Sequence, residues 1–151
     1  PMIYGPTEQP AVKLSNLNTS SKTIYGLVSN AESMPEDRLP LFCHARDVGD
    51  AHVACTEKPQ GMGQRYLLCG GKFTWAHAVK FIAEQYPELQ DRLPKGWKEA
   101  SGNLRQLDTI ASLDTKPAET VLGISFRDWQ TTLKESLDSL LELEKQPDWK
   151  N

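Results

Sequence analysis

The sequence lacks the features of chains that bind nucleic acids or span membranes. Its 151 residues carry a net charge of −3 at pH 7, so there is no basic excess to meet nucleic-acid phosphates. No apolar run approaches the roughly 20 residues that a membrane-spanning helix needs, and no signal-peptide pattern opens the chain. We therefore expect neither nucleic acid nor a membrane among its partners.

Cysteine is also scarce. The three cysteines (Cys43, Cys55 and Cys69) are an odd number and form no C-x-x-C pair. This pattern favours free thiols in a cytoplasmic protein over a disulfide framework, and it argues against a zinc or other metal site. Apolar residues make up 38% and charged residues 25% of a length that suits one compact domain over residues 1–151.

The chain begins at Pro1 with no methionine before it. Removal of the methionine from a Met-Pro start would give this end, and so would a sequence that begins partway through a longer protein. Both alternatives stay open. A third interpretation, in which the secondary amine of Pro1 acts as a base as in the tautomerases, rests on a likeness of only two residues.

Short apolar runs bounded by turn residues predict the strands. We expect strands at residues 1–6 and 41–45, the clearest one at 65–69 before a Gly-Gly pair, and a short one at 109–113. Apolar residues at helical spacing predict the helices. We expect helices over 14–28, from a cap at Asp47 to Pro59, from a cap at Thr74 to Pro87, from 114–117 to Gly123, and from Ser125 or Asp128 onward. The buried face of the last helix is expected to consist of Phe126, Trp129, Leu133, Leu137, Leu140 and Leu141.

The remaining stretches, 30–40 and 88–107, are rich in proline, glycine and charge and are expected to be loops. Strands and helices alternate, which predicts an α/β fold with a small sheet of short strands, some of them parallel, packed with about five helices.

Four segments in this order carry a resemblance to a known family: PMIYGP (1–6), FCHARDVGDAH (42–52), RYLLCGG (65–71) and SLDTKPAETVLGISF (112–126). They resemble elements of the extended short-chain dehydrogenase/reductases, in particular the dihydroflavonol-reductase-like and fungal ketoreductase branch of the epimerase/dehydratase superfamily. The resemblance runs to about Lys145, and it implies the C-terminal, substrate-binding lobe of such an enzyme.

The other half of that family's chemistry is missing from the sequence. A reductase of this family carries a G-x-x-G-x-x-G turn that seats the cofactor pyrophosphate on a helix N-terminus, and a Tyr-x-x-x-Lys pair that passes a proton to the carbonyl. The sequence has no such glycine turn, and no tyrosine is followed four residues later by lysine. The isolated chain is therefore expected to need no cofactor and to be unable to transfer hydride, whereas NADP would bind if a Rossmann half completed it.

The resemblance also suggests site residues. It implies that Met2, Tyr4, Leu41 and Phe42 border the substrate pocket, and that the backbone of Pro1, Met2 and Ile3 lies beside the nicotinamide in a completed enzyme. The alternative for Leu41 and Phe42 is an ordinary place in the core of the sheet, and Pro1, Met2 and Ile3 are more simply interpreted as the end of a strand.

His44 and Asp47 are the candidate catalytic residues, because a carboxylate close to an imidazole can orient and charge it for acid/base work. The competing interpretation makes Asp47 a helix cap. We expect His52 to be a core residue and His77 to be solvated. Glu135, Asp138, Glu142 and Glu144 are expected on the wet face of the last helix.

Three functions follow from these features. The first is a small-molecule-binding protein that catalyses a non-redox isomerisation, cyclisation or elimination on a carbonyl or polyketide-like compound. The second is a truncated or split half of an NADP-dependent ketoreductase. The third is a non-catalytic binding or assembly protein, such as a homodimer formed through an uncovered sheet edge.

Overall fold

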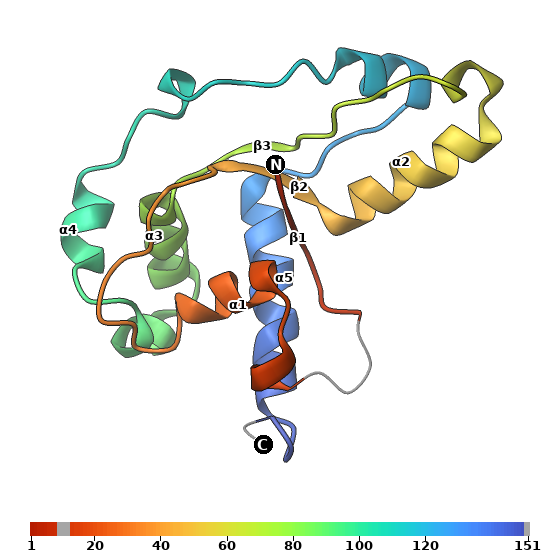
Figure 1. Ribbon diagram of the computed structural model, residues 1–151. Coiled ribbons are helices and arrows are strands. Elements are labelled where there is room, and N and C mark those ends of the chain that lie inside the picture. The colour runs from red at the N-terminus through yellow and green to blue at the C-terminus, as the bar shows by residue number, and fades with distance from the viewer. Residues whose placement is uncertain (9–12, 150–151) are drawn as a thin grey trace.

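A three-stranded mixed sheet lies at the centre of the computed structural model, which describes residues 1–8 and 13–149 (Figure 1). Strand β1 (Met2–Tyr4) pairs in parallel with β2 (Leu41–His44), and β2 pairs antiparallel with β3 (Gly71–Lys72). The predicted α/β class and the parallel pairing are confirmed.

Five α-helices surround this sheet in the described residues, as expected. They are α1 (Thr19–Gly26), α2 (Ala45–Glu57), α3 (Trp75–Gln85), α4 (Trp97–Gly102) and α5 (Trp129–Glu144). Short helical turns connect them: the 3-10 turns η1 (Leu14–Asn16), η2 (Pro59–Gly61), η3 (Pro87–Arg92) and η4 (Leu107–Thr109), and the π-helical turn η5 (Ala118–Leu122).

The strand expected at residues 65–69 is wrong, and the pairing falls on the glycines that follow it. The antiparallel register sets Phe42 opposite Gly71, and the Gly70 N–H donates to the Phe42 carbonyl at 2.8 Å. Beyond His44 the chain turns into α2, so residues 65–68 have no strand to pair with in the part of the chain that the structure describes. Residues 109–113 form no strand either.

The expected helices are largely confirmed, with three corrections. The segment 14–28 is not one helix, because Asn18 caps a separate α1 by accepting the Ser21 N–H at 2.9 Å. Asp47 lies in the first turn of α2, and the cap is His44. Residues 88–107, expected as loop, contain α4 and most of η3.

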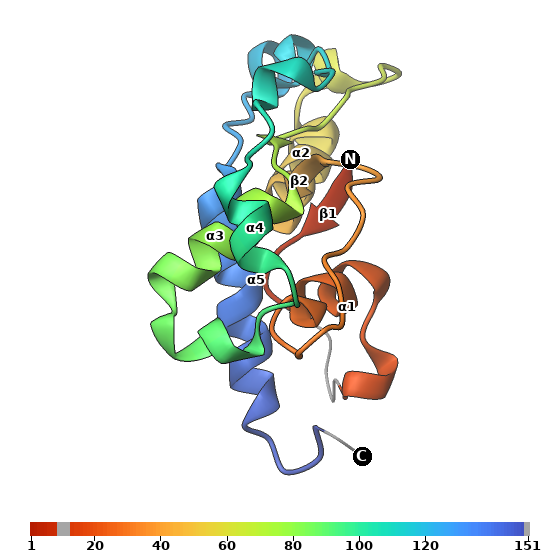
Figure 2. The ribbon, with the colours of Figure 1, turned by 90° about the vertical axis from the view of Figure 1, so that its left-hand side faces the viewer.

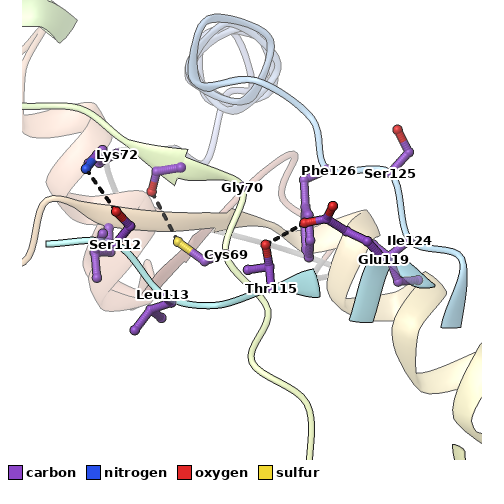
Figure 3. Close-up of a pocket in the computed structure, with 12 residues that line it drawn as sticks. Cys69, Gly70, Lys72, Ser112, Leu113, Thr115, Glu119, Ile124, Ser125 and Phe126 are labelled. Carbon is purple, nitrogen blue, oxygen red and sulfur yellow. Dashed lines mark hydrogen bonds between the residues drawn. The ribbon is translucent and has the colours of Figure 1, made fainter. Parts of the chain in front are cut away.

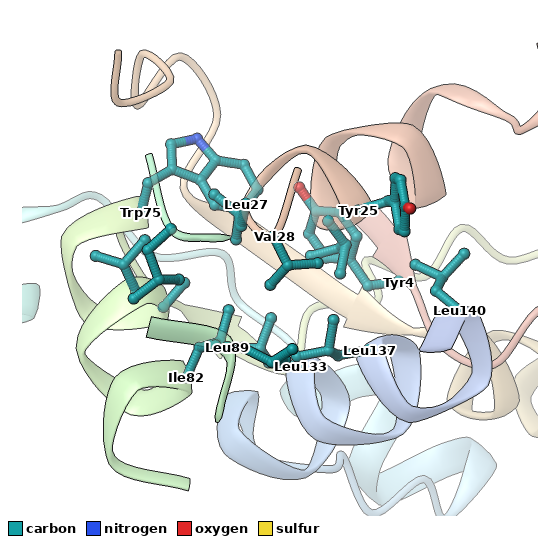
Figure 4. Packing of buried hydrophobic residues seen from close by; sticks show 14 of the residues in the cluster. Tyr4, Tyr25, Leu27, Val28, Trp75, Ile82, Leu89, Leu133, Leu137 and Leu140 are labelled. Atoms are coloured by element: carbon teal, nitrogen blue, oxygen red, sulfur yellow. The ribbon is translucent and has the colours of Figure 1, made fainter. Parts of the chain in front are cut away.

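The main hydrophobic cluster lies between α1, α3, α5 and the sheet (Figure 4). Three leucines spaced along one face of α5 are fully buried in it: Leu133, Leu137 and Leu140. They pack with Val28 and with Ile82 of α3, which Figure 4 shows on facing elements. The expected buried face of the last helix is thus confirmed.

A smaller cluster joins α2 to η5 at one end of the molecule, away from α1 and the last turns of α5 (Figures 1 and 2). Its buried members are Ala51, Ala54, Leu122 and Ile124. Gly123 ends η5 with φ +77°, a backbone conformation that favours glycine. The predicted stop at this glycine is confirmed.

Leu137→Ala tests the main cluster. Leu137 is 0% exposed, so the change should leave a cavity and lower the free energy of unfolding by about 2–5 kcal/mol. Urea unfolding followed by circular dichroism measures it. Val53→Ala, at a side chain that is 56% exposed on α2, is the control and should change stability by less than about 0.5 kcal/mol. Equal losses in the two variants would contradict the assignment of the core.

Candidate functional site

An open pocket lies where β3 meets the segments before and after η5 (Figure 3). Its volume is about 470 Å³, within the range of about 300–1,000 Å³ that small-molecule sites occupy. Leu41, Leu113, Ile124 and Phe126 supply apolar lining. The pocket is therefore large enough to admit a small organic compound.

Polar groups gather at two ends of this pocket. Lys72 and Ser112 lie at one end, and Glu119 lies at the other (Figure 3). The Lys72 Nζ donates to the Ile110 carbonyl, and it lies 3.4 Å from the Ser112 Oγ. At the opposite end, the Thr115 hydroxyl donates to the Glu119 carboxylate at 2.5 Å.

Two glycines form part of the lining, and one of them is needed there for its size. A Cβ on Gly70 would lie 2.9 Å from the Arg127 carbonyl oxygen and 3.0 Å from the Phe42 ring. Only glycine lets the chain pass between β2 and the start of α5 at this distance.

The predicted substrate-binding residues divide between the pocket and the core. Leu41 lines the pocket. Phe42 is 1% exposed beneath the glycines, and Tyr4 is buried in the main cluster, which raises the pKa of its hydroxyl to about 12. Met2 is half-buried against the same cluster. Substrate contact by all four stays a prediction.

His44 is fully buried and caps α2. Its Nδ1 accepts the Arg46 N–H at 3.1 Å, so that nitrogen carries no proton. Its Nε2 has no hydrogen-bond partner in the described residues and faces the Glu135 carboxylate at 3.4 Å. Burial lowers the pKa of His44, although Glu135 and Asp47 act in the opposite direction. Burial therefore favours the neutral form of the imidazole.

Asp47 is fully buried, and its carboxylate is paired with Arg127. Its carboxylate accepts the Arg127 backbone N–H at 2.9 Å and a bond from the Arg127 guanidinium. Asp50, more exposed, lies 3.7 Å from the same guanidinium. Both predicted catalytic side chains thus make structural contacts away from the pocket lining, and their catalytic role stays a prediction.

The environments expected for the other histidines are wrong. His52 is exposed, because the buried face of α2 follows Asp47, Ala51 and Ala54 and leaves it outside. His77 is half-buried, with its Nδ1 2.7 Å from the Thr74 hydroxyl and its ring edge-on to Trp129. Burial lowers the pKa of His77.

The expected wet face of α5 needs a similar correction. Of its four acidic residues only Glu142 is exposed. Glu135 binds Arg46 at 2.8 Å, Asp138 accepts the Tyr86 hydroxyl at 2.6 Å, and Glu144 binds Arg92 at 2.9 Å. These contacts join α5 to α2, to the end of α3 and to η3.

Sequence reasoning missed the polar ends of the pocket. Lys72 follows a glycine pair, and Ser112 and Glu119 come about forty or more residues later in segments of no chemical pattern. Their proximity depends on the path of the chain between β3 and η5, which no spacing rule reports. The one available signal was the resemblance of residues 112–126 to the reductases.

Side chains of this chain cap the N-termini of four of the described helices. A pyrophosphate needs free N–H groups at a helix N-terminus. At the N-termini of α1, α2, α3 and α5, one backbone N–H is bonded to a side chain of this chain: Asn18, His44, Asp37 and Asp128. At Gly5, a Cβ would lie 2.9 Å from the Ala45 Cβ, so that glycine is packed by protein.

Within residues 1–8 and 13–149, no group of three or more metal-ligating side chains could hold an ion. In the same described residues, every helix is too short or too polar to cross a bilayer. The three cysteines are free, and Cys43 and Cys69 are buried. Burial raises the pKa of the Cys43 thiol to about 11.

Asp47→Asn should destabilise the protein, because the buried Arg127 contacts lose their charged acceptor. We expect a loss of about 1–3 kcal/mol in the free energy of unfolding. Asp50→Asn, which removes a more exposed neighbour of the same guanidinium, is the matched control. Urea unfolding of both variants checks this, and the contact is not structural if they lose equally little.

His44→Asn should flatten the pH dependence of stability. Because the folded pKa of His44 lies below the ordinary value of about 6.5, its contribution is complete above that value and is lost as pH falls toward the lowered pKa. Asparagine can still cap α2 but does not titrate. Urea unfolding at several pH values between about 7 and about 5 measures the slope. His52→Asn, at an exposed histidine, should keep the wild-type slope; an unchanged slope in His44→Asn would refute the assignment.

Comparisons with known proteins agree with this fold. No family model matches the chain. It is 29% identical over 147 residues to the NADPH-dependent methylglyoxal reductase of Saccharomyces cerevisiae, covering 94% of this chain and 41% of that protein. It is 30% identical over 145 residues to a ketoreductase of Aspergillus niger, covering 94% and 42%.

A solved structure shows the same relation. The crystal structure of the yeast methylglyoxal/isovaleraldehyde reductase complexed with NADPH matches with a TM-score of 0.71 and 29% identity, over 94% of this chain and 41% of that one. The chain thus spans about two fifths of the length of the curated reductases that it matches. It is related, in sequence and in fold, to the C-terminal part of the NADPH-dependent reductases of the short-chain dehydrogenase/reductase superfamily.

Proposed function

We propose that this chain forms the substrate-binding part of an NADPH-dependent carbonyl reductase. In this proposal the nucleotide and the proton-donating tyrosine belong to a Rossmann part, supplied by a longer form of the protein or by a partner chain. One observation carries the proposal. The match covers 94% of this chain but only 41% of the NADPH-dependent methylglyoxal reductase of Saccharomyces cerevisiae. The absence of a glycine turn and of a Tyr-x-x-x-Lys pair in the sequence agrees with it.

The geometry of the sheet supports this division. The parallel register sets Met2 beside Phe42, so Pro1 and Leu41 lie at the same end of the sheet. Leu41 lines the pocket, and the resemblance sets Pro1, Met2 and Ile3 beside the nicotinamide. A carbonyl compound in the pocket would then lie near the position expected for the hydride donor.

The edge of β1 supports a docking partner. β1 has a paired strand on one side only among the described residues, and its Ile3 side chain is 47% exposed. An edge strand with unpaired backbone groups and an exposed apolar side chain is a surface that usually pairs or is covered. A second copy of this chain could also cover it, and the homodimer remains the alternative for a non-catalytic assembly protein.

The non-redox isomerase, cyclase or lyase has less support. It would need His44 and Asp47 to reach a substrate, and both side chains are 0% exposed. We retain a cytoplasmic location as part of the proposal, because the three cysteines are free.

Reconstitution tests the reductase proposal. The chain is mixed with the separately produced part of the yeast methylglyoxal reductase that this chain does not match, and NADPH oxidation is followed with methylglyoxal. We expect turnover in the mixture and in neither part alone, because the cofactor site and the pocket lie on different parts.

Two matched variants make the result specific. Ile3→Lys places a charge on the exposed β1 edge and should abolish the NADPH oxidation gained by mixing the two parts. Val53→Lys, at a similarly exposed apolar residue on α2, should keep that activity. NADPH-dependent turnover by the chain alone would contradict the proposal. So would a gain that survives Ile3→Lys.

A further inference from the structure

The pocket carries a separation of charge that its packing does not require. We propose that it binds a small organic carboxylate, with the acid group at Lys72 and the apolar part between the walls of the pocket. This inference deepens the proposed function by naming the substrate class: a carbonyl compound that also carries an acid group. It rests on the proposed function for the carbonyl, whereas the binding of the acid can be measured without it.

Lys72 supplies an uncompensated positive charge. An ammonium group has three hydrogens, and the Ile110 carbonyl and the Ser112 hydroxyl account for two of them. Across the described part of the chain, no carboxylate lies within 4.0 Å of its Nζ. The two contacts fix the ammonium in the wall, and the third donor and the charge remain for a ligand.

Ser112 strengthens the site at the same end. Its hydroxyl can donate as well as accept, so it can bond a second oxygen of the acid group. Together the ammonium and the hydroxyl present two donors to the two oxygens of a carboxylate. A charge-assisted bond of this kind is about twice as strong as a neutral one.

Glu119 at the far end sets the direction of the ligand. Its carboxylate accepts the Thr115 hydroxyl at 2.5 Å, and no cation lies within salt-bridge distance of it among the described residues. An acid group would be repelled there and attracted to Lys72 (Figure 3). The pocket therefore favours one orientation, with the acid at Lys72.

The walls fix the size and polarity of the rest of the ligand. Leu41, Leu113 and Phe126 provide apolar surface in a pocket of about 470 Å³. A phenyl ring or a short branched chain suits such a volume, whereas a long polymer does not. Benzoylformate, which joins a phenyl ring, a ketone and a carboxylate, is therefore a suitable probe.

The test compares benzoylformate with its methyl ester by isothermal titration calorimetry on the full chain. The ester keeps the ring and the ketone but has no charge. We expect the acid to bind at least about tenfold more tightly than the ester, a difference of about 1.4 kcal/mol. Added sodium chloride should weaken the binding of the acid and leave the affinity for the ester unchanged, because salt screens only the charged contact.

Variants locate the effect. Lys72→Met should lower the affinity for the acid to that of the ester, and Lys72→Arg should keep most of it. Lys58→Met is the matched control: this lysine also donates to a backbone carbonyl, that of Leu122 at 2.5 Å, but it lines the neighbouring groove. It should leave the affinity for the acid unchanged. Glu119→Gln should leave that affinity unchanged or raise it. Circular dichroism verifies that each variant is folded.

Equal binding of the acid and the ester to the wild-type chain would overturn the inference, and this result does not depend on any variant. A loss of acid binding in Lys58→Met equal to that in Lys72→Met would also overturn it. Failure of the reconstitution with acid binding intact would instead remove the reductase proposal alone. The two proposals thus fail by different results.

Discussion

The buried contact between Asp47 and Arg127 is the interaction on which the rest of the structure depends. Asp47 lies in the first turn of α2, the helix that follows β2. Arg127 immediately precedes Asp128, the N-cap residue of α5. The Asp47 carboxylate accepts hydrogen bonds from both the backbone N–H and the guanidinium of Arg127. It therefore fixes the position and the direction of the segment that leads into α5. Because Ile124 and Phe126 pack in the small cluster and Trp129 packs in the main one, this contact joins the two hydrophobic clusters.

The same contact shapes the pocket. Residues 124–126 line both the pocket and the neighbouring groove, and Arg127 holds their end against α2. On the other side, Gly70 passes so close to the Arg127 carbonyl oxygen that a side chain would not fit. A polar anchor and a glycine therefore determine the pocket wall together. Asp47, a candidate catalytic residue from the sequence, thus helps to fix the shape of the pocket in this structure.

The backbone N–H groups at the helix N-termini and the charged side chains of the pocket differ in whether this chain itself supplies their partners. At the N-terminus of each of its four longer helices, one backbone N–H is bonded to a side chain of the chain itself. Among the residues that the structure describes, Lys72 and Glu119 are the charged side chains of the pocket that have no partner of opposite sign. These two charged groups lie in a chain that is related to the C-terminal part of NADPH-dependent reductases.

The sequence by itself determined the local elements and the ancestry. The spacing of Leu133, Leu137 and Leu140 predicted the buried face of α5, and Gly123 predicted the end of η5, because helical periodicity and left-handed backbone are properties of neighbouring residues. Only the tertiary structure decided the sheet pairing and the site. Among the described residues, 65–68 lack a partner strand because β2 gives way to α2. The path of the chain after β3 brings Ser112 to Lys72 at one end of the pocket and Glu119 to the other end. Such contacts depend on distances between segments, and no periodicity within a segment encodes them.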